Sequence, residues 1–249
     1  MEEHEIFFQQ YGNHAYKYND IPDKFDYDWV MFKSRWPWLQ LDLDIPYQEM
    51  YKEGIALEHK FVEHRWNDQF RGYKHQGWKS LAIHGIDSQK TENFHAYGYK
   101  SQEAAPYDWT EIANQCPATL KFLKLLPFEN KYRIRFMLLE PGGYIYPHKD
   151  QDDFSFYPIN IALNHPKGCK FAMEEVGVLP FVPGSAFHMN LGYRHCVINH
   201  SQEKRLHLII HAAPGSKINQ HKRLIEKSFN KLKESKEKKW TTFLDKVLP

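Results

Sequence analysis

The fold of this chain is decided by two stretches: KYRIRFMLLEPGGYIYPHKD at residues 131–150 and HCVINHSQEKRLHLIIH at residues 195–211. The first begins with aromatic, β-branched and aliphatic residues typical of a β-strand, and residues 140–143 (EPGG) then predict a turn. The second begins with a short strand, and residues 205–211 alternate between outward and inward positions with a period of two. Both stretches therefore predict β-structure.

The same two stretches carry side chains that bind metals. His148 and Asp150 are two residues apart, so their side chains lie on the same side of an extended segment, and His195 comes from a distant strand. Two imidazoles and one carboxylate are the ligand set of mononuclear non-heme Fe(II) oxygenases, which keep the remaining positions for cosubstrate and oxygen. Four other histidines compete by residue type, and we expect them to have structural roles: His188, His200, His207 and His211.

Arg205 opens the alternating run, and a hairpin would bring it close to His195. A guanidinium binds a carboxylate through two parallel hydrogen bonds and stays charged when buried. Arg205 is therefore the candidate to bind a small dicarboxylate. His207 lies on the same predicted strand face, which makes it the main rival to His195 as a metal ligand.

Three segments together resemble a known family: residues 139–148, 158–163 and 195–205 are similar to the aspartyl/asparaginyl β-hydroxylases. These are 2-oxoglutarate- and Fe(II)-dependent dioxygenases, and the family includes bacterial proline hydroxylases. Weaker similarity extends over roughly residues 75–213. The resemblance implies a mainly β fold with flanking helices, a double-stranded β-helix or cupin-like jelly roll.

The resemblance also implies roles for individual residues. It carries over His148, Asp150 and His195 as the Fe(II) ligands and Arg205 as the residue that binds the distal carboxylate of 2-oxoglutarate. Some family members lack the carboxylate ligand, so Asp150 matches the complete triad of the proline-hydroxylase branch. Asn160 stands where peptidyl aspartate hydroxylases have a histidine, and we expect it to hydrogen-bond the cosubstrate or substrate.

The reaction that the resemblance implies is hydroxylation of an unactivated C–H of an amino acid, free or within a peptide. It would use Fe(II), 2-oxoglutarate and O2 and release succinate and CO2, with proline as the first substrate choice and aspartate or asparagine as the second. Arg133, Arg135 and Arg194 are candidates to bind a substrate carboxylate. Two other functions stay open: a cupin-like metal protein without oxygen chemistry, and an oxygenase that reaches a nucleic-acid-associated substrate through a basic tail.

The domain organisation follows from length and periodicity. A chain of 249 residues with 42% hydrophobic content can bury one sizeable core, so we expect one catalytic domain. Residues 1–75 predict a helical and loop extension, with a helix-like run over about 47–65, and residues 76–215 hold the jelly roll. Residues 216–249 predict a basic amphipathic helix that packs on the roll or against a second copy of the chain in a homodimer.

Composition excludes several function classes. The net charge is +2 although residues 216–249 carry ten Lys or Arg against four acids; solvated Lys-rich helices are common, so we do not expect a nucleic-acid partner. The three cysteines are odd in number and widely spaced, which predicts neither disulfides nor a zinc site. With no apolar run of about 18 residues and no signal sequence, we expect a cytoplasmic enzyme without a membrane partner.

Overall fold

The computed structural model describes residues 1–18, 20–64 and 74–247, with side chains up to residue 235. In this part of the chain the strands are β1 Trp38–Gln40, β2 Val62–Glu63, β3 His75–Gly85, β4 Asp108–Trp109, β5 Asn130–His148, β6 Ile159–Ala162, β7 Cys169–Met173, β8 Gly177–Val178, β9 Ala186–Met189, β10 His195–Asn199 and β11 Arg205–Ala213. The α-helices are α1 Glu3–Tyr11, α2 Tyr47–Ala56, α3 Pro117–Leu125 and α4 Ile218–Val247. Short helical turns span Trp29–Lys33, Glu58–Lys60, Phe94–Tyr97, Ala113–Gln115 and Gly215–Lys217.

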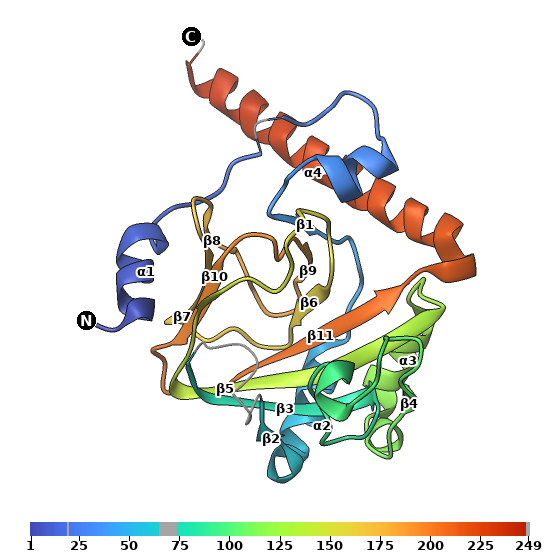
Figure 1. Cartoon of the computed structure of the whole chain (residues 1–249). Helices are drawn as coiled ribbons and strands as arrows, with labels where there is room; N and C mark the ends of the chain where they lie inside the picture. The colour runs from blue at the N-terminus through green and yellow to red at the C-terminus, as the bar shows by residue number, and fades with distance from the viewer. Residues whose placement is uncertain (19, 65–73, 248–249) are drawn as a thin grey trace.

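The described strands form one hydrogen-bonded network in the order β1-β9-β6-β11-β5-β10-β7-β8, and β3 pairs with the other side of β5 (Figure 1). All strand pairs in this network are antiparallel. The network folds back on itself because β5 belongs to both halves. The result is a jelly roll with helices on the outside, which confirms the predicted double-stranded β-helix.

Strand β5 changes partner along its length. It pairs with β11 from Asn130 to Leu139 and with β10 from Tyr144 to His148. The segment 140–143, predicted to end the strand, instead lies within β5, and β3 pairs with β5 on both sides of this segment, with a register shift across it. Gly142 has a φ of +72° in this segment, a conformation that suits glycine. The expected turn is therefore wrong, and one strand carries the chain from one half of the roll to the other.

The alternation predicted for residues 205–211 separates two apolar cores. Leu206, Leu208 and Ile210 of β11 belong to an outer core with residues of the flanking helices. Ile209 faces the inside of the roll together with Met137 of β5. The inward face of β11 therefore carries Arg205, His207 and Ile209, as the period of two predicted.

Helix α2 lies directly on the outer face of the roll (Figure 1). A Cβ at Gly54 would come within 2.7 Å of the Leu206 side chain, so any larger residue would require that buried side chain to shift. The helix ends at Ala56 rather than near residue 65, and the chain then enters a short helical turn and strand β2. The segment 1–75 also contributes β1, which pairs with β9 of the roll.

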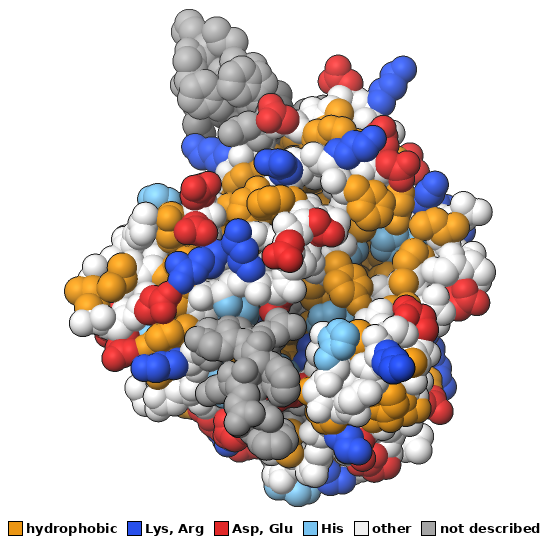
Figure 2. Space-filling model, in the orientation of Figure 1, with side chains coloured by type: hydrophobic (Ala, Val, Ile, Leu, Met, Phe, Trp, Pro, Cys, Tyr) orange, Lys and Arg blue, Asp and Glu red, His pale blue; other side chains and the backbone are white. Residues whose placement is uncertain are grey.

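The C-terminal part of the chain forms the predicted amphipathic helix. Ile225 and Phe229 of α4 are buried in the outer core, and Lys227 and Lys231 both form ion pairs with Asp42. On the face in Figure 2, basic and acidic side chains are interspersed rather than gathered in one patch. Within the described part of the chain, no helix is both long and apolar enough to cross a bilayer.

Candidate metal and 2-oxoglutarate site

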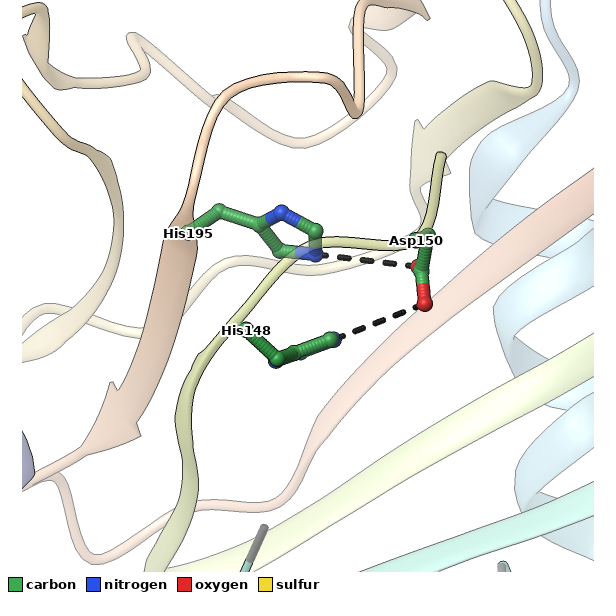
Figure 3. A group of neighbouring side chains, drawn as sticks. All are labelled: His148, Asp150 and His195. Carbon is green, nitrogen blue, oxygen red and sulfur yellow. Dashed lines mark ion pairs between the residues drawn. The ribbon is translucent and has the colours of Figure 1, made fainter. Parts of the chain in front are cut away.

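The end of β5 and the start of β10 bring two histidines side by side. His148 and His195 are Cα partners in the antiparallel register, and their ring centroids are 4.2 Å apart. Asp150 follows His148, and its carboxylate faces the Nε2 atoms of both rings from one side (Figure 3). One carboxylate oxygen lies 3.8 Å from His148 Nε2 and the other 3.7 Å from His195 Nε2. The strand pairing therefore builds the predicted triad from segments 45 or more residues apart.

Backbone carbonyls orient both rings. His148 Nδ1 lies 2.7 Å from the carbonyl of Tyr146, and His195 Nδ1 lies 3.0 Å from the carbonyl of Tyr193. Because a carbonyl can only accept, each Nδ1 carries the proton, and each Nε2 presents its lone pair to the other members of the triad. Phe171 stacks on His195 with ring centroids 5.4 Å apart.

The three donor atoms lie within 4.8 Å of one another, a spacing that can hold one metal ion. Among the residues that the structure describes, this is the one cluster of histidine, cysteine and acidic side chains with such a spacing. Two neutral imidazoles and one carboxylate fit Fe(II) with open coordination positions. The histidines at 188, 200, 207 and 211 lie outside the cluster.

The triad opens onto a small pocket of about 60 Å³ inside the roll. Most of its wall is apolar and comes from several strands: Trp78, Met137, Ile145, Phe171, Met189, Val197 and Ile209. Its polar lining, besides the triad, consists of Asn160 and Arg205. An apolar wall with few polar groups excludes water and orients a small ligand.

Arg205 is the buried cation of this pocket. Its side chain is 2% exposed, and no carboxylate of the described residues pairs with it. Burial lowers the pKa of Arg205 to about 10, so the guanidinium is still protonated at neutral pH. Its Nε atom is buried without a hydrogen-bond partner. A buried cation with an unused donor fits a carboxylate ligand, as 2-oxoglutarate would supply.

A neutral histidine lies behind Arg205. The Nη2 atom of Arg205 is 2.8 Å from His207 Nδ1, and because a guanidinium only donates, His207 accepts. The Asn160 side chain is also 2.8 Å from His207 Nδ1. Burial first, and Arg205 second, hold the pKa of His207 well below its usual range. His207 thus supports Arg205 rather than the metal.

His165 is a neighbour that the sequence did not point to. Its Nδ1 lies 3.3 Å from His207 Nε2. Burial first, and Arg205 second, lower the pKa of His165 to about 4. His165 lies in the loop between β6 and β7, where the sequence has no periodicity that predicts an inward direction. The pairing of β6 with β11 brings it close to His207.

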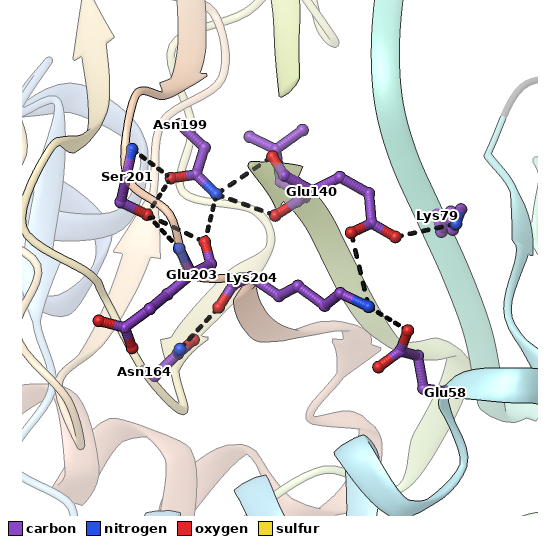
Figure 4. A network of polar contacts seen from close by, with 9 residues as sticks. Glu58, Lys79, Glu140, Asn164, Asn199, Ser201, Glu203 and Lys204 are labelled. Carbon is purple, nitrogen blue, oxygen red and sulfur yellow. Dashed lines mark hydrogen bonds and ion pairs between the residues drawn. The ribbon is translucent and has the colours of Figure 1, made fainter. Parts of the chain in front are cut away.

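A polar network fixes the turn between β10 and β11 on the bend of β5 (Figure 4). The Asn199 side-chain amide donates to the carbonyls of Leu139, Glu140 and Glu203 at 2.8–3.1 Å. Lys204 forms ion pairs with Glu58 and Glu140. These contacts hold the chain immediately before Arg205, so they set where its guanidinium enters the pocket.

The three candidate substrate arginines lie in two places. Arg135 and Arg133 lie two and four residues before Met137, on the same face of β5, and Arg135 Nη1 donates to the Thr91 carbonyl at 2.7 Å. Arg194 instead forms an ion pair with Glu3 of α1 at the surface. It does not line the pocket, so the structure does not support the expectation for Arg194.

Comparison with known proteins agrees with this geometry. The family model described as aspartyl/asparaginyl beta-hydroxylase matches residues 46–214. The chain belongs to this family. It is therefore an enzyme of the 2-oxoglutarate- and Fe(II)-dependent oxygenase class, with Fe(II), 2-oxoglutarate and O2 as its cofactors. No curated protein matches the chain.

Solved structures with a similar arrangement include an oxidoreductase of the 2OG-Fe(II) oxygenase family from Burkholderia pseudomallei, with 12% identity, a TM-score of 0.43 and coverage of 72% of this chain and 84% of that one. A Pseudomonas putida prolyl-4-hydroxylase has 14% identity and a TM-score of 0.40, with 75% and 96% covered. A Trichoplax adhaerens prolyl hydroxylase in complex with a peptide fragment of hypoxia inducible factor has 12% identity and a TM-score of 0.41, with 69% and 79% covered. Likenesses this distant carry no conclusion about the substrate.

Proposed function

We propose that this member of the aspartyl/asparaginyl β-hydroxylase family hydroxylates an unactivated C–H of an amino acid, free or peptidyl. Proline is the first choice and aspartate or asparagine the second. In the balanced reaction, the substrate C–H becomes C–OH while 2-oxoglutarate and O2 give succinate and CO2. The observation that supports this proposal is one pocket that holds both a His-Asp-His triad and a buried arginine.

Each side chain of the pocket has a part in the proposal. His148, Asp150 and His195 would hold Fe(II), which supplies the redox chemistry that couples O2 and 2-oxoglutarate to hydroxylation. Arg205 would bind the far carboxylate of 2-oxoglutarate and so fix its direction in the pocket. The carbonyls of Tyr146 and Tyr193 orient the two histidine rings so that each Nε2 faces the metal position, and the apolar wall keeps water away from the reacting carbon.

Asn160 supports a choice among the amino-acid substrates. Its side-chain oxygen lies 2.8 Å from His207 Nδ1 at the wall of the pocket, at the position where a peptidyl aspartate hydroxylase would have a histidine. An amide carries no charge, so this position offers no cation to an aspartate side chain. The proposal therefore ranks proline before aspartate.

The direct test is product analysis. Iron-loaded protein is incubated with 2-oxoglutarate and O2 and with pools of amino acids and short peptides, and succinate is measured together with any product heavier by one oxygen. We expect equal amounts of succinate and hydroxylated product, lost in His148→Ala and kept in His200→Ala, which removes an exposed histidine outside the site. Absence of substrate-dependent succinate and of 2-oxoglutarate binding would favour a cupin-like metal protein instead.

A further inference from the structure

Three side chains behind the metal pocket form one hydrogen-bonded series, which we call the buried row: Arg205, His207 and His165. Arg205 Nη2 lies 2.8 Å from His207 Nδ1, and His207 Nε2 lies 3.3 Å from His165 Nδ1. Every nitrogen of a guanidinium carries a proton, so His207 Nδ1 must present its lone pair to Arg205. The neutral imidazole then carries its proton on Nε2 and donates it to His165. The buried row therefore has one direction, from Arg205 through His207 to His165.

The buried row is shielded from water. His207 is fully buried and Arg205 is 2% exposed. The Phe181 ring packs against both histidines, with its centroid 4.8 Å from that of His207 and 5.5 Å from that of His165. In such surroundings water does not replace a lost partner, so a broken hydrogen bond leaves a buried polar group unsatisfied. The Arg205 guanidinium therefore has a strong reason to keep the direction that His207 gives it.

The loop after β6 is fixed to β11 on both sides of Arg205. The Asn164 side chain donates through its Nδ2 to the Lys204 carbonyl at 2.8 Å, and its oxygen accepts from the Leu206 N–H at 2.6 Å. The backbone N–H of Asn164 also donates to the Leu206 carbonyl at 3.2 Å. His165 is the next residue of the loop and ends the buried row. One short segment therefore holds the backbone around Arg205 and, through the row, its guanidinium.

The buried row connects to the pocket through Arg205, which is the member of the row that lines it. An arginine side chain has many rotamers, and a guanidinium that is free to move loses this freedom when it binds a carboxylate. A guanidinium that is already held loses less, so its ligand binds more tightly. The Nε atom of Arg205 has no hydrogen-bond partner and can donate to a carboxylate oxygen. The row thus leaves one donor for a ligand and fixes its direction.

We propose that His207 and His165 are positioning residues that hold the Arg205 guanidinium in one direction and so determine the preference for a 2-oxoacid with a second carboxylate. The inference rests on the proposed function, and it adds the residues that select the cosubstrate to the residue that binds it. Neither histidine lines the pocket. Their effect should therefore appear for ligands whose far end reaches Arg205 and not for ligands that end in an apolar group.

Two ligands of equal length distinguish this role from a general structural one. 2-Oxoglutarate and 2-oxovalerate share the same 2-oxoacid group, but 2-oxovalerate ends in a methyl group in place of the second carboxylate. Both are titrated by calorimetry into Fe(II)-loaded protein without O2, and the readout is the ratio of their two dissociation constants. We expect the wild type to bind 2-oxoglutarate about 30-fold or more tightly than 2-oxovalerate, because only 2-oxoglutarate pairs with the buried cation.

Substitutions in the buried row should change this ratio. His207→Leu should lower it by about tenfold or more, through weaker 2-oxoglutarate binding, and leave the dissociation constant of 2-oxovalerate within about threefold. In His207→Asn the side-chain oxygen can accept from Arg205 in place of Nδ1, so the ratio should stay within about threefold of the wild type. His165→Leu should lower the ratio by a smaller factor, about threefold or more, and His165→Asn should restore it.

His221→Leu is the matched control, because it removes another buried histidine that lies in α4 and does not line the pocket; it should keep the ratio. A normal ratio in His207→Leu, an equal loss of affinity for both ligands, or a ratio in His207→Asn as low as in His207→Leu would overturn the positioning role. If His207→Leu does not fold, an unchanged ratio in His165→Leu would overturn it. A wild type that does not bind 2-oxoglutarate, or that binds both ligands equally, would instead count against the proposed function, and the inference would fall with it.

Discussion

At the scale of single residues, ring orientation distinguishes the metal-binding histidines from the other buried ones. His148 and His195 each have Nδ1 on a backbone carbonyl two residues earlier and Nε2 directed at Asp150. His207 is equally buried, but its Nδ1 accepts from the Arg205 guanidinium, and Asn160 Oδ1 also lies 2.8 Å from that atom. From residue type and predicted strand face, His207 was a rival of His195, and only the resemblance to the family favoured His195. The partner of each ring nitrogen separates them.

A first prediction concerns His195. Fe(II) should raise the melting temperature of the wild type, because it binds the folded state alone. His195→Ala removes one of the three metal ligands, so Fe(II) should no longer raise the melting temperature of this variant. His200→Ala, an exposed histidine five residues later, should keep the increase. Differential scanning fluorimetry without O2 measures this. An unchanged Fe(II) response in His195→Ala would refute the ligand assignment.

A second prediction concerns Arg205. Arg205→Gln should weaken 2-oxoglutarate binding by about 2–5 kcal/mol, because it removes the charged partner of a buried carboxylate. The melting temperature without ligand should stay the same or rise, since an uncompensated buried cation does not stabilise the fold. Calorimetry and thermal unfolding of the same variant separate the two effects. A large loss of stability with normal 2-oxoglutarate affinity would show that the arginine is structural.

At the scale of elements, strand periodicity was predictable and strand ends were not. The alternation from Arg205 onward predicted the inward face of β11 because local spacing alone determines it. The bend at 140–143 was predicted as a stop, because turn residues carry no information about the neighbouring strands. The paired segment β1 was not predicted either, since its three residues pair with β9 about 150 positions away.

A third prediction concerns the turn that leads into β11. Asn199 is fully buried and donates to three carbonyls, including those of Leu139 and Glu140. Asn199→Ala should lower the free energy of unfolding by about 1–3 kcal/mol, because buried acceptors lose their donor. It should also weaken 2-oxoglutarate binding by displacing Arg205. Asn130→Ala, at an exposed position of β5, is the control in urea unfolding and calorimetry; equal effects of both variants would contradict the role of the turn.

At the scale of the whole molecule, the chain joins the jelly roll to α4 through buried neutral histidines. A hydrogen bond of 2.9 Å joins His221 Nδ1 of α4 to the Tyr27 hydroxyl. The His221 ring also lies 5.8 Å from the ring of His188 in β9. Burial lowers the pKa of His188 to about 3 and that of His221 to about 4. The helix was predictable from its periodicity, but this histidine contact was not, because it joins segments far apart in sequence.

A fourth prediction follows for acid stability. In the unfolded chain these histidines bind protons below about pH 6.5, whereas in the folded chain His221 binds a proton only below about pH 4. Between these two pH values the unfolded state binds more protons, so the free energy of unfolding should fall as the pH drops. Each histidine contributes at most about 1.4 kcal/mol per pH unit. Urea unfolding as a function of pH should show a smaller slope for His221→Asn than for His59→Asn, an exposed control. Identical slopes for the two variants would contradict the claim that the buried His221 makes the free energy of unfolding depend on pH.

The central claim is that one pocket holds Fe(II) by the triad and 2-oxoglutarate by Arg205. Titration of the protein with Fe(II) without O2, followed by 2-oxoglutarate, tests it through the visible charge-transfer absorption of an iron–oxoacid chelate. We predict a band that saturates at about one iron per chain, requires 2-oxoglutarate, disappears in His195→Ala and needs more 2-oxoglutarate in Arg205→Gln. A wild-type protein that shows no band at saturating concentrations, or a band that persists in His195→Ala, would contradict the account.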